Sequence, residues 1–218
     1  MTPLTAVKCA NIAYLKDGEF AANQQGFEYH PLGNQSACGW VGHKGDKTVV
    51  AIRGTVIAAD RGQNYGPNFQ TDLVPWMGPG LVHEGYYTAL WHLMGDLKRH
   101  LTGREEVYFT GHSMGAAIAL LGAALFRCVR VFCFASPRVG NKTFADITGE
   151  LIRVTRYENR GDFLTKFPLS GLVKGGRRRI KENYCHVGRV VRLPRLGHGM
   201  SAYVTGIEEK QRKHEAFF

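Results

Sequence analysis

The 218-residue sequence lacks the features that mark several classes of protein. Its five cysteines are an odd number without a C-x-x-C pair, which argues against a disulfide framework and against a zinc site. No apolar run approaches the roughly 18 residues that a membrane-spanning helix needs. The amino-terminal residues form neither a basic leader nor an unbroken apolar stretch, so we expect no secretory signal. A reducing compartment such as the cytoplasm is therefore the expectation, and the sequence identifies no other.

Acidic residues are in the minority, and the formal net charge is +10. Such an excess favours attraction to anionic lipid, nucleic acid or an acidic protein surface. Part of the positive charge is concentrated between Lys174 and Lys181, where a solvated loop is the default interpretation. We keep a peripheral contact with an anionic membrane surface as a hypothesis and expect no nucleic acid partner.

The most informative stretch, Gly111-His112-Ser113-Met114-Gly115, fits the pattern G-x-S-x-G. A short apolar segment with β-propensity precedes it, and a long run of Ala, Leu and Ile follows it. This order predicts a strand, a sharp turn and a buried helix, with Ser113 as a nucleophile at the apex. The strand and helix backbones come close together at the turn, which leaves no room for a Cβ at Gly111 or Gly115. His112 is expected to be a scaffold residue. A serine that only caps a core helix is the plainer alternative.

Helical and β-prone segments alternate along most of the chain, which predicts an α/β fold with a mostly parallel central sheet flanked by helices. Residues 56–83 are rich in Gly and Pro and are expected to be irregular, and such long excursions are usually functional. Without an internal repeat or linker, residues 1–218 are expected to form a single domain. The remaining predictions are a helix to about Tyr14, a hairpin around Gly45, a helix over 85–101, strands over 107–110, 129–134, 152–157 and 184–193, a short helix over 144–151, and a final helix after Gly199.

A serine nucleophile needs an acid and a base, which follow such an elbow in that order along the chain. Asp162 is the favoured acid, because it lies in a loop just past the strand expected to end near Tyr157. Asp146 lies in a predicted helix, and Glu158 is adjacent to the strand with arginine neighbours, so both are weaker candidates.

The favoured base is His198, because it lies between two glycines in a loop after the last predicted strand. Two other histidines follow the acid. His186 is expected inside a strand, where packing is the default role, and His214 lies in a charged terminal segment.

These residues together resemble the class 3 lipase family, the fungal-lipase-like branch of the α/β-hydrolases. The resemblance extends from about Ala6 to Tyr203 and rests on short motifs in the family's order. The similar segments are Val49–Thr55, Asn68–Leu73, Val82–Tyr86, the elbow, Ala135–Asn141, Asp162 with Pro168, Tyr184–Gly188, and His198 with Tyr203.

The resemblance implies an α/β-hydrolase fold and an oxyanion hole made by two backbone amides. One amide belongs to Met114, which follows the nucleophile, and the other to Thr55, which follows Arg53-Gly54. The plainer interpretation of Thr55 is a strand-end cap. The resemblance also implies a lid between Thr55 and Phe69, where this chain is longer than the family pattern and carries several polar residues.

The function implied is that of a serine carboxylic-ester hydrolase, a lipase or esterase that cleaves acyl-glycerol or related lipid esters through an acyl-enzyme. Ser113, Asp162 and His198 supply the chemistry, so no metal or organic cofactor is expected. One alternative is a phospholipase A-type hydrolase that acts on anionic membranes, suggested by the net charge. A non-catalytic binding module that keeps the hydrolase frame is a second alternative, and acyl transfer in place of hydrolysis is a third.

Overall fold

The computed structural model describes residues 1–33, 37–54, 72–169, 171–175 and 178–215. Its centre is a seven-stranded sheet in the order β1-β2-β3-β6-β7-β8-β11. The strands are β1 (Glu28–Gly33), β2 (Cys38–Lys44), β3 (Lys47–Ile52), β6 (Glu106–His112), β7 (Arg130–Phe134), β8 (Arg153–Arg160) and β11 (Arg189–Leu196). The first three strands pair antiparallel, and the pairs from β3 to β11 are all parallel. The predicted mostly parallel sheet is therefore confirmed.

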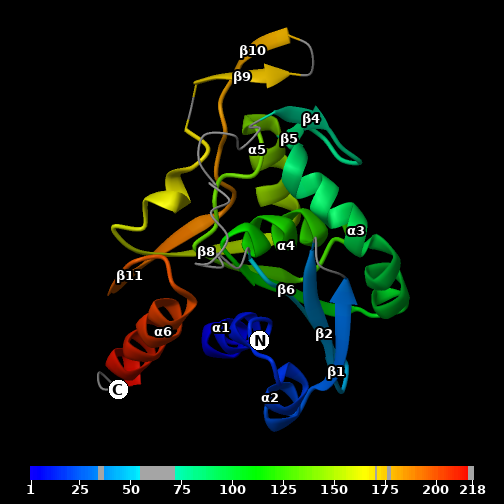
Figure 1. The fold of residues 1–218 in the computed structure, drawn as a ribbon, viewed down its shortest axis with the longest axis vertical. Helices are drawn as coiled ribbons and strands as arrows, with labels where there is room; N and C mark the ends of the chain where they lie inside the picture. The colour runs from blue at the N-terminus through cyan, green and yellow to red at the C-terminus, as the bar shows by residue number, and fades with distance from the viewer. Residues whose placement is uncertain (34–36, 55–71, 170, 176–177, 216–218) are drawn as a thin grey trace.

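Helices cover both faces of this sheet (Figure 1). On one face lie α1 (Pro3–Ile12), α2 (Gly18–Gln24) and α6 (Met200–Glu215), and on the other lie α3 (Glu84–Leu101), α4 (Met114–Leu125) and α5 (Lys142–Leu151). A 3-10 turn, η1 (Phe163–Lys166), follows β8. Within the described residues, no helix combines the length and the apolar character needed to cross a bilayer.

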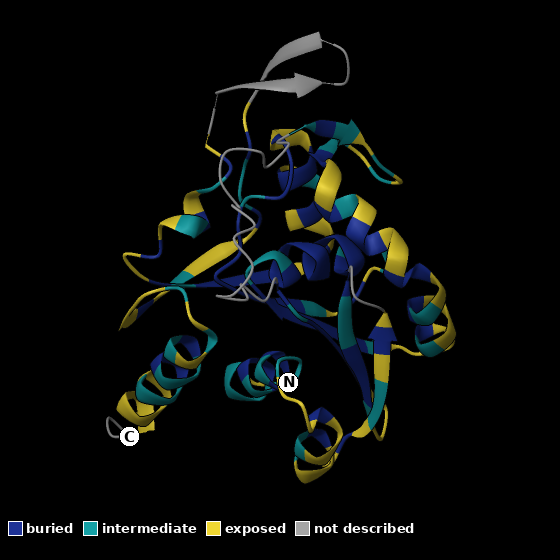
Figure 2. Cartoon of the chain, viewed as in Figure 1, coloured by how far each residue is buried: buried dark blue, intermediate teal, exposed yellow. Residues whose placement is uncertain are grey.

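Buried residues concentrate along the sheet and on the inner sides of the helices (Figure 2). The largest apolar cluster joins α3 and α4 to the sheet, and a second cluster joins α1 and α6 to the opposite face. Helix α4 is apolar on nearly every side because it is packed between the sheet and α3, as its sequence predicts. This burial fixes the position of the turn that precedes α4.

Some predictions about secondary structure are wrong. The chain between α1 and β2 forms α2 and β1, which were not predicted because this segment is polar and has no clear periodicity. Within the stretch expected to be irregular, β4 (Leu73–Pro75) and β5 (Leu81–His83) pair as a small hairpin. The basic segment expected to be a loop forms a second hairpin, β9 (Gly171–Gly175) with β10 (Arg178–Glu182). Residues 184–188 precede β11 and are not part of it, which removes His186 from a strand.

The turn between β6 and α4 depends on the absence of side chains. A Cβ at Gly111 would overlap the backbone of Gly115, and a Cβ at Gly115 would overlap the carbonyl oxygen of Ile52. In each case the obstacle is backbone, which cannot rotate away. The predicted role of both glycines is therefore supported by the packing.

We expect Gly115→Ala to lower the free energy of unfolding by about 3 kcal/mol, because the added methyl group must displace β3. The matched control is Gly95→Ala on α3, where an added Cβ has no neighbour within 4 Å. That change should raise the free energy of unfolding by up to about 1 kcal/mol, the usual gain for alanine over glycine inside a helix. Denaturant titrations of the two variants test this, and equal effects would contradict the packing argument.

Candidate active site

Ser113 lies at the apex of the turn between β6 and α4. Its backbone has φ 58° and ψ −130°, a conformation that costs a residue with a side chain about 1–3 kcal/mol. The Ser113 amide donates a hydrogen bond of 2.9 Å to the carbonyl oxygen of Phe134 on β7, which holds the strained residue in place. This backbone conformation points the Ser113 hydroxyl toward the loop that carries His198.

The three residues predicted as nucleophile, base and acid lie in hydrogen-bonding contact. His198 Nε2 is 2.8 Å from Ser113 Oγ, and His198 Nδ1 is 3.0 Å from both carboxylate oxygens of Asp162. Because a carboxylate accepts, Nδ1 of His198 carries the proton and donates it. Nε2 therefore presents its lone pair to the Ser113 hydroxyl, which donates. This arrangement suits proton transfer from a serine to an imidazole.

Asp162 is held by groups from three segments. Its side chain is fully buried, and besides His198 it accepts hydrogen bonds from the Leu164 amide, at 3.2 Å, and the Tyr203 hydroxyl, at 2.6 Å. The Tyr203 hydroxyl in turn accepts from the Asn159 amide at 3.1 Å. Burial, the largest cause, and then the contact with Asp162 raise the pKa of Tyr203, so this hydroxyl remains a donor. Three donors thus offset the burial of the Asp162 carboxylate.

A second series of hydrogen bonds holds the backbone of His198 in place. His112 Nε2 lies 2.7 Å from the carbonyl oxygen of His198, and only a protonated nitrogen can donate to a carbonyl. Burial, with a smaller contribution from His198, lowers the pKa of His112 to about 4, so its ring is neutral and Nδ1 is an acceptor. The Tyr14 hydroxyl donates to that Nδ1 at 2.9 Å and accepts from the Gly54 amide at 3.0 Å.

This series connects four segments that are distant along the chain. Tyr14 follows α1, Gly54 lies two residues after β3, His112 ends β6, and His198 precedes α6. The His112 ring thus contacts the His198 carbonyl and the Tyr14 hydroxyl, and these contacts could not be read from the sequence neighbours of His112. Tyr14 was missed altogether, since a lone tyrosine 98 residues before its partner leaves no local signal.

The predicted oxyanion donors differ in how far the structure describes them. Met114 is the first residue of α4, so its amide lies at the amino end of the helix beside Ser113, where the helix dipole favours negative charge. Residues 55–71 lie outside the described residues, and they include Thr55 and the lid predicted between Thr55 and Phe69. The rest of the predicted irregular segment forms the β4–β5 hairpin.

The weaker candidates for acid and base have other partners. Asp146 pairs with Lys142 on the surface of α5, and Glu158 pairs with the buried Arg156 and with Arg192. His186 lies before β11, where burial and the neighbouring Arg156 lower its pKa to about 3. His214 is exposed in the last turn of α6.

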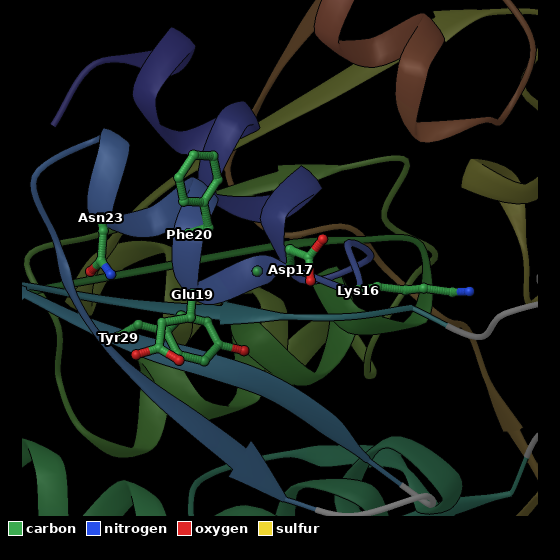
Figure 3. A pocket seen from close by; sticks show the side chains of 7 residues that line it. Lys16, Asp17, Glu19, Phe20, Asn23 and Tyr29 are labelled. Carbon is green, nitrogen blue, oxygen red and sulfur yellow. The ribbon is translucent and has the colours of Figure 1, made fainter.

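A hollow on the molecular surface lies elsewhere, between α2 and β1 (Figure 3). Two carboxylates, Asp17 and Glu19, line it together with Lys16, Phe20 and Tyr29. Ser113, Asp162 and His198 are not part of this lining. The hollow is thus separate from the contacts described above.

Comparison with known proteins identifies the family of this chain. The family model described as Lipase (class 3) matches residues 49–171, which is more than half of the chain. The chain belongs to the class 3 lipase family. The matched residues include the elbow and Asp162, while His198 lies beyond their end.

Relatives in the family include enzymes of two named kinds. The chain is 28% identical over 145 residues to phospholipase A1-IIbeta of Arabidopsis thaliana. This match covers 56% of this chain and 35% of the relative. The chain is 31% identical over 122 residues to secreted mono- and diacylglycerol lipase 1 of Fusarium solani, with 49% and 36% covered. The matches thus span about a third of the length of these curated relatives.

Among solved structures, the fold is similar to that of Rhizomucor miehei lipase in its propeptide complex. The TM-score is 0.65 at 17% identity, with 87% of this chain and 67% of that chain covered. At this identity the likeness concerns the fold, and it confirms the α/β-hydrolase architecture.

Two buried histidines, His83 and His112, and the half-buried His186 make the fold sensitive to acid. Burial is the largest cause in each, and it lowers the pKa of His83 to about 4, of His112 to about 4 and of His186 to about 3. Since the unfolded pKa is about 6.5, the unfolded chain binds protons below that pH that the folded chain does not. The stabilisation is therefore fully present above pH 6.5 and is lost as the pH falls toward 4.

We expect unfolding near pH 5 to take up about three protons, one for each of these histidines. Denaturant titrations between about pH 7.5 and pH 5 measure this number from the slope of the unfolding free energy against pH. His83→Gln should reduce it by about one. A free energy that stays flat across this range would show that the buried rings are protonated in the folded chain.

Proposed function

We propose that this chain is a serine hydrolase of lipid esters, with Ser113 as nucleophile, His198 as general base and Asp162 as the acid that orients it. The observation that carries the proposal is the continuous hydrogen-bonded series from Ser113 Oγ through the His198 ring to the buried Asp162 carboxylate. Membership of the class 3 lipase family supports the same assignment.

In the first step, Ser113 Oγ bonds to the ester carbonyl carbon while its proton passes to His198 Nε2. Asp162 stabilises the imidazolium that forms. The tetrahedral intermediate then expels the alcohol, which leaves with the proton from Nε2, and an acyl-enzyme remains. A water molecule repeats the sequence, with His198 as base, and releases the fatty acid and the free serine.

The negative oxygen of each tetrahedral intermediate requires hydrogen-bond donors. We assign this role to the amides of Met114 and Thr55, the second on the family resemblance. The position of Met114 at the amino end of α4 supports the first assignment. A single such donor typically contributes about 10²–10³ in rate.

Apolar side chains around the site support a lipid as substrate. Phe163 and Leu196 are each 74% exposed. Phe163 directly follows the acid, and Leu196 lies two residues before the base and opposite Arg160 on β8. Large exposed apolar groups next to a reaction site are costly in water and are stabilised by contact with acyl chains. The phospholipase and acylglycerol lipase relatives agree with this substrate class.

The cellular setting is a further part of the proposal. All five cysteines have free thiols, and Cys9, Cys128 and Cys133 are buried. Free thiols in this number support a reducing compartment such as the cytoplasm.

Replacing the nucleophile tests the proposed activity directly. Ser113→Ala should lower kcat on a short-chain acyl ester by at least about 10⁴-fold, because the variant lacks the side-chain oxygen to which the acyl group bonds. A fluorophosphonate should add its mass once to the unmodified chain and not to this variant. The variant should keep its thermal stability, since the Ser113 side chain has no packing role at the apex. Esterase activity retained by Ser113→Ala would overturn the assignment.

The second candidate function is a phospholipase A activity on anionic membranes. The β9–β10 hairpin projects from the sheet beyond α5 (Figure 1), and its sequence carries Lys174, Arg178, Arg179 and Lys181. Together with the net charge of +10, this hairpin provides a basic segment that attracts acidic headgroups. The phospholipase A1 relatives favour the same candidate.

We expect the Ser113→Ala variant, which cannot hydrolyse the lipid, to bind vesicles that contain phosphatidylserine. Its affinity for these vesicles should fall as the salt concentration is raised. Adding Arg178→Gln and Arg179→Gln should weaken this binding by roughly tenfold or more. The matched control changes Arg212 and Lys213, two exposed cations at the end of α6, to Gln and should bind like the parent. Equal binding to neutral and anionic vesicles at low salt would rule out this candidate and leave a neutral ester as the substrate.

A further inference from the structure

Three histidines from three separate elements meet on the surface of the molecule. His30 lies on β1, His43 on β2 and His100 in the last turn of α3. Their ring centroids are 4.7 to 5.9 Å apart, and one possible ligand nitrogen from each ring lies within 4.8 Å of the others. All three residues are partly exposed, so an ion from solvent can reach them.

Strand alternation explains why these side chains meet. Side chains at every second position of a strand share one face of the sheet. Val41 and Leu32 pack against α3, so His43 and His30, two positions away from them, point to the same face. Glu28 is the cross-strand partner of His43 and lies on this face as well. His100, near the carboxyl end of α3, reaches the same place because α3 packs on this face of the sheet.

Neighbouring groups orient two of the three rings. His43 Nδ1 is 3.0 Å from the hydroxyl of Thr48, a fully buried residue on β3, which leaves Nε2 of His43 for another partner. Glu28 lies 3.2 Å from His30 and places a carboxylate beside that ring. Histidine ligands of metal ions commonly use their second nitrogen in this way, in a hydrogen bond that fixes the ring.

We propose that His30, His43 and His100 form a binding site for a transition-metal ion, with Zn²⁺ as the best-suited ion. Three imidazole nitrogens are a frequent donor set for Zn²⁺, with a fourth position for water or a carboxylate. Zn–N bonds of about 2.0–2.1 Å place tetrahedral ligands about 3.3 Å apart, so ligand nitrogens that lie within 4.8 Å of one another need to approach by at most about 1.5 Å. Side-chain rotation at a partly exposed site achieves this.

The site is separate from the proposed reaction centre. His43 is paired with Thr48 near the start of β3, while Ile52 at the end of β3 is paired with Gly111 of the elbow. Four residues of strand correspond to about 13 Å, so the ion would not reach Ser113. Its effect is structural, because it joins the edge strand β1 and the neighbouring strand β2 to the carboxyl end of α3.

Zinc binding to the untagged chain, stripped with a chelator, tests the site by calorimetry and by thermal unfolding. We expect one equivalent of Zn²⁺ to bind and to raise Tm, since an ion that binds only the folded chain stabilises it. His100→Ala should weaken the affinity by at least about 100-fold, and Thr48→Val, which only frees the His43 ring, by about tenfold. Bound Co²⁺ should show the visible absorption of a four-coordinate ion.

His92→Ala is the matched control, because His92 is exposed on the same helix and outside the cluster. It should leave the affinity for Zn²⁺ unchanged. If His100→Ala does not fold by circular dichroism, His30→Gln removes a ligand from an edge strand and should give the same loss. No binding of Zn²⁺, or binding that survives removal of His100 or His30, would overturn the proposal, as would an equal loss with His92→Ala.

Discussion

The architecture depends on one close approach of three backbones. The end of β6, the start of α4 and the end of β3 meet where Gly111 and Gly115 have no side chains. That contact turns the chain sharply enough to place Ser113 in a strained conformation. The strain is maintained by the burial of α4 between the sheet and α3, so the large apolar core and the small reactive turn are parts of one mechanical unit.

Much of this unit can be predicted from the sequence, because its signals are local. The apolar strand and the apolar helix around the elbow are visible as patterns, and so are the carboxylate and the histidine in loops that follow later strands. The order in which Ser113, Asp162 and His198 occur was therefore enough to propose them as partners. Their hydrogen-bonding distances could be established only from coordinates.

Other features depend on contacts between segments that are distant in sequence, and no pattern within either segment reveals them. β1 is an edge strand with polar residues, and it is recognisable only by its pairing with β2. The β4–β5 hairpin has three residues in each strand, too few for a periodicity. The hydroxyl of Tyr14 and the histidines on β1, β2 and α3 acquire their neighbours only when the sheet and helices have packed.

The two tyrosines that support the proposed acid and base lie toward opposite ends of the chain. Tyr14 follows the first helix, and Tyr203 lies in the last one, and α1 and α6 pack against each other over the sheet. A chain still emerging from the ribosome has Ser113 long before it has Tyr203 or His198. The complete arrangement thus forms only after α6 has been made and has docked beside α1, so a nascent chain that already contains Ser113 cannot yet carry out the proposed reaction.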